Sequence, residues 1–130
     1  MIAVDTSALI AVLANEALAE ECEIILLENE LIMSAGTLTE ALIVGSRPEF
    51  EDRMRGFIKD LVIEVVPVSE GFAELALSAH LRWGKRRHPA RLNYGDCFSY
   101  ALAELYDCSL LFVGNDFAQT DIRSALAPTA

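Results

Sequence analysis

Four acidic residues that lie far apart in the chain could together form one site: Asp5, Glu40, Asp96 and Asp116. Four carboxylates in one cleft repel one another, since two unit charges about 4 Å apart cost around 4 kcal/mol at an effective dielectric of 20. Divalent cations would remove this repulsion, and a ligand set without His or Cys suits Mg²⁺ or Mn²⁺ rather than zinc. Such a site could polarise a phosphodiester, activate a water and stabilise the departing oxygen.

Three of the four acids also have a purely structural interpretation. Asp96 would then only offset the partial positive charge of a helix end. Asp5 would cap the helix that follows it, and Glu40 would complete a capping box with Thr37. Asp121, in a turn near the C-terminus, is a fifth candidate ligand. Whether the acids converge in space decides between the two interpretations.

The stretch 92–105 predicts the helix that places Asp96. Asn93 is a preferred N-cap residue, and the acid three residues later completes a capping box. The apolar residues that follow recur at helical spacing and predict a buried face: Cys97, Phe98, Ala101, Leu102 and Leu105. We therefore expect Asp96 in the first turn of this helix, at the mouth of the core.

Four short apolar runs predict strands, at residues 2–4, 31–33, 62–66 and 110–113. Apolar spacing and cap residues predict helices between them, at 8–14, 16–29, from Thr37 onward, 48–61 and 69–83. Parallel strands need such helical crossovers, and the crossovers cover both faces of the sheet. We expect an α/β fold in three layers with a central, mainly parallel sheet of four to five strands. The fifth would be a short edge strand within 123–130, ended by Pro128.

This arrangement predicts that the acids meet. The carboxyl ends of parallel strands share one edge of the sheet, which is where open α/β proteins bind ligands. Asp5 and Asp116 follow expected strands directly. Glu40 and Asp96 lie in expected first turns of helices whose N-termini face the same edge.

The composition predicts one domain over residues 1–130, because 53% of the residues are hydrophobic and the length suits a single core. No apolar run approaches the roughly 18 residues of a membrane span. The N-terminal run has no basic leader and contains an acid, so we expect no secretory signal. Three cysteines without a CxxC pair fit reduced thiols. These features favour a cytoplasmic protein.

The net charge of -10 argues against broad affinity for nucleic acid, since most of the surface would repel phosphate. Basic residues instead gather just before Asp96: Lys85, Arg86, Arg87, His88 and Arg91. This segment is either a solvated loop or a local site for RNA phosphates. Arginines next to an acid cluster suit a polyanion that is held beside metal ions.

The sequence resembles the PIN-domain nucleases and, within them, the VapC toxins of bacterial toxin-antitoxin pairs. The resemblance covers essentially the whole chain and rests on VDTSALIA, LTEALIV, GKRRHPARLNYGDCFSYALA and LLFVGNDFAQTDI. It implies a PIN-like α/β/α sandwich and an Mg²⁺-dependent endoribonuclease that cuts single-stranded or loop RNA. It also implies inhibition by a VapB antitoxin, which inserts a segment near the site, and homodimerisation.

The resemblance further implies roles for particular residues. The family's acids correspond here to Asp5, Glu40, Asp96 and Asp116, with Asp121 as a possible addition. Thr6 or Ser7 would support Asp5, and Asn115 would orient Asp116.

Two other functions are open to a chain of this composition. A noncatalytic RNA-binding or protein-binding regulatory module on the same fold would have no reason to bear the repulsion of four acids. An aspartyl-phosphate protein would need a second Asp two positions after Asp5 or a lysine near the last strand. Position 7 is Ser and no lysine follows Lys85, so we set that function aside.

Overall fold

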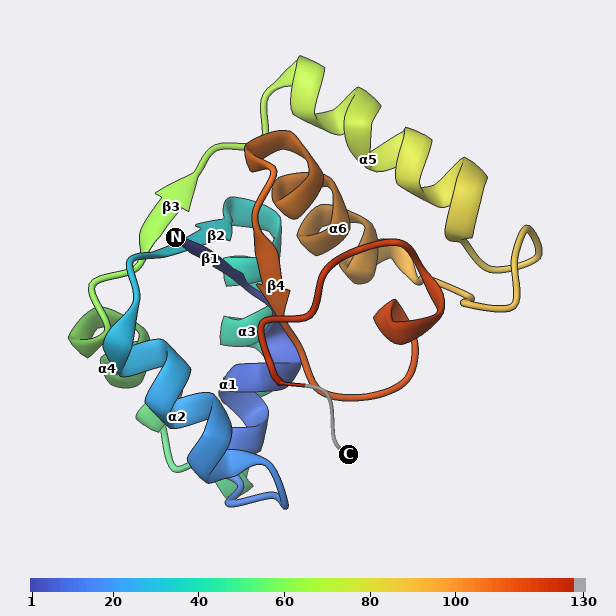
Figure 1. Ribbon diagram of the computed structural model, residues 1–130. Helices are drawn as coiled ribbons and strands as arrows, with labels where there is room; N and C mark the ends of the chain where they lie inside the picture. The colour runs from blue at the N-terminus through green and yellow to red at the C-terminus, as the bar shows by residue number, and fades with distance from the viewer. Residues whose placement is uncertain (128–130) are drawn as a thin grey trace.

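The computed structural model describes residues 1–127. Its centre is a sheet of the strands β1 (Ile2–Val4), β2 (Leu31–Ser34), β3 (Glu64–Val66) and β4 (Ser109–Leu111). The strand order is β3-β2-β1-β4, and all three pairings are parallel. The expected parallel sheet is therefore confirmed, with four strands in the described residues (Figure 1).

Two strand boundaries differ from the prediction. The third strand begins two residues late, because Val62 still belongs to the turn that ends the preceding helix, with a left-handed φ of 53°. The fourth strand ends at Leu111 rather than Val113. The expected fifth strand is reduced to one parallel bridge between Leu110 and Ser124. Pro128, its expected end, lies outside the described residues.

In the described part of the chain, six α-helices connect and cover the strands: α1 (Thr6–Leu13), α2 (Ala19–Glu28), α3 (Ala35–Gly45), α4 (Arg53–Asp60), α5 (Glu70–Trp83) and α6 (Tyr94–Tyr106). Short 3-10 turns lie at Pro48–Phe50 and Phe117–Gln119. No helix within residues 1–127 is long and apolar enough to cross a bilayer.

The prediction of one continuous helix over 48–61 is wrong. The 3-10 turn at its start is separated from α4 by Glu51 and Asp52, which both adopt left-handed backbone conformations, with φ of 51° and 56°. Two successive residues in that region cannot continue a right-handed helix. Met54 and Ile58 on α4 still face the core, as their spacing predicts.

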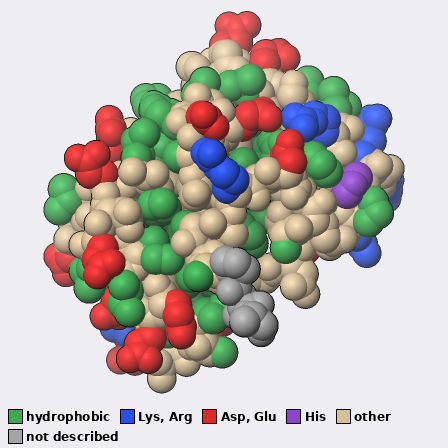
Figure 2. Space-filling model, in the orientation of Figure 1, with side chains coloured by type: hydrophobic (Ala, Val, Ile, Leu, Met, Phe, Trp, Pro, Cys, Tyr) green, Lys and Arg blue, Asp and Glu red, His purple; other side chains and the backbone are tan. Residues whose placement is uncertain are grey.

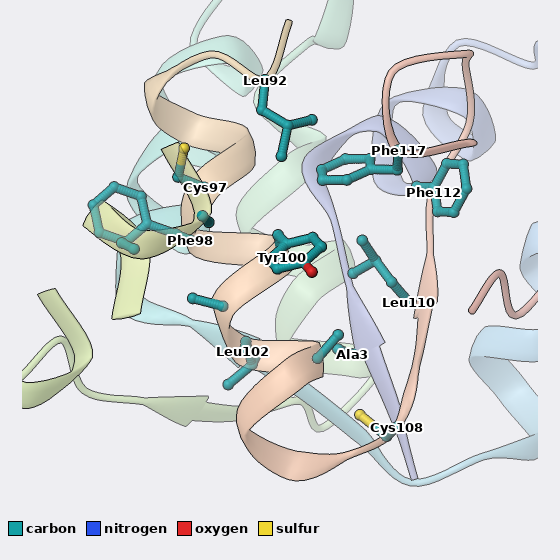
Figure 3. Close-up of a cluster of buried hydrophobic side chains, with 14 of the residues drawn as sticks. Ala3, Leu92, Cys97, Phe98, Tyr100, Leu102, Cys108, Leu110, Phe112 and Phe117 are labelled. Atoms are coloured by element: carbon teal, nitrogen blue, oxygen red, sulfur yellow. The ribbon is translucent and has the colours of Figure 1, made fainter. Parts of the chain in front are cut away.

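The side chains of the strands alternate between two apolar cores, which makes the three layers. Ala3 and Leu110 lie in the core covered by α5 and α6 (Figure 3). Val4 and Leu111, the next residues along the same strands, lie in the opposite core with residues of α1, α2 and α4. Because successive strand residues point to opposite faces, β1 and β4 each stabilise both layers.

Most of the predicted buried face of α6 is confirmed, since Cys97, Phe98, Ala101 and Leu102 are all buried. Leu105 is an exception, with 53% of its surface exposed. Ala103 and Cys108 occupy the core at this end of the helix instead. The core face of α6 therefore ends one turn earlier than its sequence pattern predicts.

Candidate active site

Three of the predicted acids line one hollow at the carboxyl edge of the sheet. Asp5 directly follows β1, and its backbone N–H donates to the Leu111 carbonyl at the end of β4. The hollow, here called the acid cleft, has a volume of about 360 Å³. It is lined by Asp5, Ser7, Asp96, Val113, Gly114, Asn115, Asp116 and Phe117. The topology thus brings together residues from both ends of the chain.

Glu40 reaches the same place from α3. It lines the neighbouring hollow with Gly95, the residue just before Asp96. A Cβ atom at position 95 would overlap the Glu40 carboxylate, so only glycine lets this side chain approach α6. All four predicted acids are therefore neighbours in space.

Asp96 makes the capping box that its sequence predicts and also belongs to the acid cleft. Its Oδ2 accepts from the Asn93 N–H at 3.0 Å, and its own N–H donates to Asn93 Oδ1 at 2.9 Å. Burial, together with the smaller effect of the charges on Asp5, Asp116 and Glu40, raises the pKa of Asp96 to about 7, although the hydrogen bond from the Asn93 N–H lowers it. The capping box of Asp96 is therefore confirmed, and its role as a metal ligand remains a prediction.

Asp5 is 4% exposed and each of its oxygens accepts hydrogen bonds. Oδ2 accepts from the Ser7 N–H at 3.0 Å, which caps α1, and from the Ser7 hydroxyl at 2.6 Å. Oδ1 accepts from the Ser99 hydroxyl at 2.5 Å. Sequence analysis missed Ser99, although a polar residue on the apolar face of α6, three positions after Asp96, was a usable signal.

The two hydroxyls after Asp5 serve different acids. Ser7 supports Asp5, as the resemblance implied, and its oxygen also accepts from the Val113 N–H at 3.0 Å. Thr6 instead donates to Glu40 Oε1 at 2.6 Å. Since side chains on adjacent helix residues point in directions about 100° apart, one of them turns to β1 and the other to α3.

The prediction that Thr37 and Glu40 form a capping box is wrong. Ser34 caps α3, with its hydroxyl accepting from the Gly36 N–H at 3.1 Å. Helix α3 therefore begins earlier than predicted, and Thr37 lies fully buried inside its first turn. Glu40 consequently lies in the second turn, held by Thr6 rather than by the end of its own helix.

Asn115 and Asp116 both line the acid cleft. Asp116 precedes the 3-10 turn at Phe117–Gln119, and the Asn115 carbonyl accepts from the Gln119 side chain at 3.4 Å. Within residues 1–127, the Asn115 side chain makes no hydrogen bond to Asp116. Its expected orienting role remains a prediction.

Asp121 does not join the other acids. Its Oδ1 accepts from the Tyr100 hydroxyl at 2.5 Å, and its Oδ2 accepts from Arg82 at 3.2 Å. Arg82 also pairs with Glu104 at 3.1 Å. Asp121 lines a separate hollow with Glu104 and Arg123, so we leave it out of the acid cleft.

The predicted basic segment forms a loop between α5 and α6. Lys85, Arg86, Arg87 and Arg91 are exposed and make no ion pair within the described residues. The His88 ring instead packs edge-on against Trp83, 4.7 Å between centroids, and its Nδ1 accepts from the Ala90 N–H. Figure 2 shows Lys and Arg side chains gathered on the side of the molecule where this loop lies. The arginines and the lysine are available to a ligand, whereas His88 holds the loop.

The acids suit a cation by their chemistry, although their present positions do not close a metal site. Within residues 1–127, no three His, Cys, Asp or Glu side chains are placed to hold one ion together. Asp96 is turned to Asn93 and Glu40 to Thr6. The donor set consists of carboxylate oxygens alone, and their mutual repulsion is the condition that a divalent cation relieves. A shared ion would require the side chains of Asp96 and Glu40 to turn toward the cleft.

Comparison with known proteins agrees with this geometry. The PIN domain family model matches residues 2–123, and the chain belongs to the PIN-domain family. Within it, the chain is a VapC-type member. It is 38% identical to ribonuclease VapC30 of Mycobacterium tuberculosis over 130 residues, which cover 96% of this chain and 98% of the relative. It is 37% identical to ribonuclease VapC of Mycolicibacterium smegmatis over 126 residues, which cover 93% and 97%.

Solved structures share the fold. The crystal structure of Mycobacterium tuberculosis VapC20, described as a sarcin-ricin loop cleaving toxin, superposes with a TM-score of 0.76 at 18% identity. The match covers 98% of this chain and 100% of that one. A toxin-antitoxin complex from Klebsiella pneumoniae matches with a TM-score of 0.69 at 17% identity, covering 93% of each chain. The expected PIN-like α/β/α sandwich is confirmed.

Proposed function

We propose that this protein is the toxin of a type II toxin-antitoxin pair and acts as an Mg²⁺-dependent endoribonuclease. One observation carries the proposal: acids from four separate segments meet at the carboxyl edge of the sheet, and no Lys or Arg is paired with them in the described residues. The relatives at 37–38% identity are VapC ribonucleases by name, which supports RNA as the substrate.

Asp5, Glu40, Asp96 and Asp116 would hold the metal. A bound Mg²⁺, for which Mn²⁺ can substitute, supplies a polarised phosphoryl oxygen and a more acidic water. The chain itself orients Asp5 through Ser7 and Ser99, whereas Glu40, which accepts from Thr6, would turn toward the cleft to reach the metal. Asn93 keeps Asp96 at the N-terminus of α6 by accepting its backbone N–H.

The exposed bases Lys85, Arg86, Arg87 and Arg91 would hold RNA phosphates. Their loop leads directly into α6, so a phosphate bound there lies beside the acid cleft. The overall charge of -10 repels RNA phosphates from most of the surface, so the contact is confined to this basic segment. A short contact of this kind favours a folded RNA loop, which can present one phosphate group to one segment. His88 contributes by fixing the loop against Trp83.

Partners would cover two further surfaces. Exposed apolar residues flank the hollows between α3, α5 and α6, namely Ile43, Val68, Leu77 and Tyr94. We assign this surface to a homodimer, because contiguous apolar patches mark protein contacts.

A VapB-type antitoxin would inhibit by laying a segment over the acid cleft, where a basic side chain would complement the acids. The free thiols Cys22, Cys97 and Cys108 suit the reducing cytoplasm in which both partners would be made.

The decisive experiment uses purified, partner-free protein and structured RNAs, with and without Mg²⁺. The parent is compared with Asp5→Asn and Asp96→Asn, and Asp121→Asn is the matched control outside the cleft. We expect Mg²⁺-dependent cutting that is lost in the first two variants and kept in the control. Metal binding by the parent without cutting would instead support a noncatalytic binding module. Cutting that persists in both cleft variants would place the chemistry elsewhere.

A further inference from the structure

Two hydroxyl side chains lie buried behind the acid cleft, where they contact no solvent. Thr37 on α3 is 0% exposed and Ser99 on α6 is 1% exposed. Their oxygens are 3.2 Å apart, and the Ser99 oxygen is 2.5 Å from Asp5 Oδ1. Thr37 and Ser99 are 62 positions apart in sequence, and Ser99 and Asp5 are 94 apart. These contacts therefore join α3 and α6 to the end of β1.

The direction of these hydrogen bonds follows from counting donors. An ionised carboxylate can only accept, and a hydroxyl carries a single hydrogen. Ser99 therefore gives its hydrogen to Asp5. Thr37 must then donate to Ser99, since Ser99 has no second hydrogen to offer. The pair forms a relay that runs from Thr37 through Ser99 to Asp5 and ends on the acid.

Helix formation does not explain a serine at position 99. Alanine has the higher helix propensity, and Ala101 and Ala103 occupy neighbouring buried positions on the same helix. A buried hydroxyl also costs free energy unless it is hydrogen-bonded. At Ser99 that cost is offset only because Asp5 accepts its hydrogen. The relay therefore acts on Asp5 rather than on α6.

The relay completes the support of Asp5 on both oxygens. Ser7 fixes Oδ2 from α1 through two donors, and Ser99 fixes Oδ1 from α6. With donors from two elements, the carboxylate cannot rotate without losing a hydrogen bond. Asp5 lines the acid cleft with its carboxylate fixed in this way.

We propose that Thr37 and Ser99 are positioning residues, which hold the Asp5 carboxylate in the orientation that a divalent cation requires. This inference rests on the proposed function only in taking Asp5 as a metal ligand. Neither Thr37 nor Ser99 lines the acid cleft. Both would nevertheless control how tightly the cleft binds a cation. Hydrogen-bond partners of metal ligands commonly change metal affinity by about 10–100-fold when they are removed.

The test is a Mn²⁺ titration of the full chain, followed by the electron paramagnetic resonance signal of free Mn²⁺. Ser99→Ala is compared with Tyr100→Phe, a matched control on the adjacent residue. Each variant removes one buried hydroxyl from α6, but the Tyr100 hydroxyl points to Asp121, outside the cleft. We expect Ser99→Ala to weaken Mn²⁺ binding by about 10-fold or more, whereas Tyr100→Phe should stay within about twofold of the parent.

Three further variants separate positioning from a general loss of structure. Ser99→Thr keeps the hydroxyl and should restore affinity to within about threefold of the parent, and Thr37→Val should give a smaller loss than Ser99→Ala. Thr37→Val decides the matter if Ser99→Ala does not fold, as judged by circular dichroism. Asp5→Asn marks the complete loss of the ligand.

The outcomes distinguish this inference from the proposed function. If Ser99→Ala and Thr37→Val bind Mn²⁺ like the parent while Asp5→Asn does not, the metal site stands and the relay proposal is overturned. If affinity falls equally in Tyr100→Phe, the effect is general destabilisation and the proposal is also overturned. A parent that binds no Mn²⁺ would remove both the metal site and its positioning residues.

Discussion

The molecule contains two groups of acids that are built in opposite ways. In the first, here called the Arg82 cluster, Glu104 and Asp121 both pair with the Arg82 guanidinium. The guanidinium also lies over the Trp83 ring, 5.3 Å from its centroid, and Asp121 accepts from the Tyr100 hydroxyl. In the acid cleft, the carboxylates accept only from hydroxyls and backbone N–H groups.

The difference indicates that the acids of the Arg82 cluster stabilise the fold, whereas those of the acid cleft are suited to binding a cation. The Arg82 cluster pairs both of its acids with one guanidinium and ties α5 and α6 to the segment that carries Asp121. The acid cleft leaves its charge uncompensated, and burial together with the neighbouring acids raises the pKa of Asp96 to about 7. A group of acids with its own arginine needs no ligand, whereas one without a cationic side chain is ready to bind a cation from solution.

RNA cleavage should separate the two groups most strongly. We expect Asp5→Asn to lower the cleavage rate by about 100-fold or more. The variant loses a carboxylate ligand of the metal ion, whose charge would stabilise the transition state. Asp121→Asn makes the same chemical change in the Arg82 cluster and should stay within about threefold of the parent. The measurement is the initial rate on a structured RNA at fixed Mg²⁺. Equal losses in the two variants would erase the distinction.

Added Mg²⁺ should stabilise the protein through the acid cleft alone. A ligand at 100 times its dissociation constant adds about 2.7 kcal/mol to the free energy of unfolding, which raises the melting temperature by several degrees. We expect this rise in the parent and in Asp121→Asn, but not in Asp5→Asn or Asp96→Asn. Differential scanning fluorimetry with a matched increase in NaCl controls for ionic strength. A rise in every variant would mean that the cation acts elsewhere.

Tyr100→Phe should act on stability and not on metal binding. It removes the hydroxyl that donates to Asp121, and the loss of such a hydrogen bond costs about 1–1.5 kcal/mol. Urea unfolding followed by circular dichroism would show a lower midpoint with an unchanged slope. The Mg²⁺-induced stabilisation should be retained, and its disappearance would couple the two regions that we describe as separate.

The pH dependence of stability should carry a small signature of the acid cleft. The folded pKa of Asp96 is raised to about 7 from the ordinary value of 3.8, so the folded state binds its proton more tightly. Stability from this group is complete below about pH 4 and declines as the pH rises through 7. Solvent screening keeps the change below about 1 kcal/mol, since Asp96 is only partly buried.

Asp96→Asn is the variant that tests this signature. It should flatten the decline in metal-free buffer, as measured by urea unfolding at pH 5.5, 7 and 8. Asp121→Asn should leave the decline unchanged. A parent whose stability rises over this range would contradict the raised pKa of Asp96.

Residues with local determinants were predictable from the sequence. The capping box of Asn93 with Asp96 depends on four consecutive residues, and the placement of Asp5 depends on a strand that ends at Val4. Ser34 and Thr37 show the limit of local reasoning, since both are good cap residues and the extent of β2 decides between them. Sequence alone could identify the acids because the strand ends of a parallel sheet must share an edge.

Contacts between distant residues were not predictable in this way. Ser99 meets Asp5 across 94 positions, and Thr6 turns to Glu40 rather than to the acid beside it. Asp121 was a candidate fifth ligand as an acid in a turn near the C-terminus, but it bonds to Tyr100 and Arg82 and lines a separate hollow. Each of these outcomes depends on how helices that are distant in sequence pack against one another and the sheet, and no local pattern encodes that packing.

The pairing of β1 with β4 has a consequence for synthesis of the protein. Asp5 leaves the ribosome more than 100 residues before Asp116 and after the strand β1, whose partner β4 is made later. A nascent chain therefore lacks one wall of the cleft until β4 and Asp116 have been synthesised. During that interval the messenger and the ribosome meet a cleft whose acids are not yet assembled.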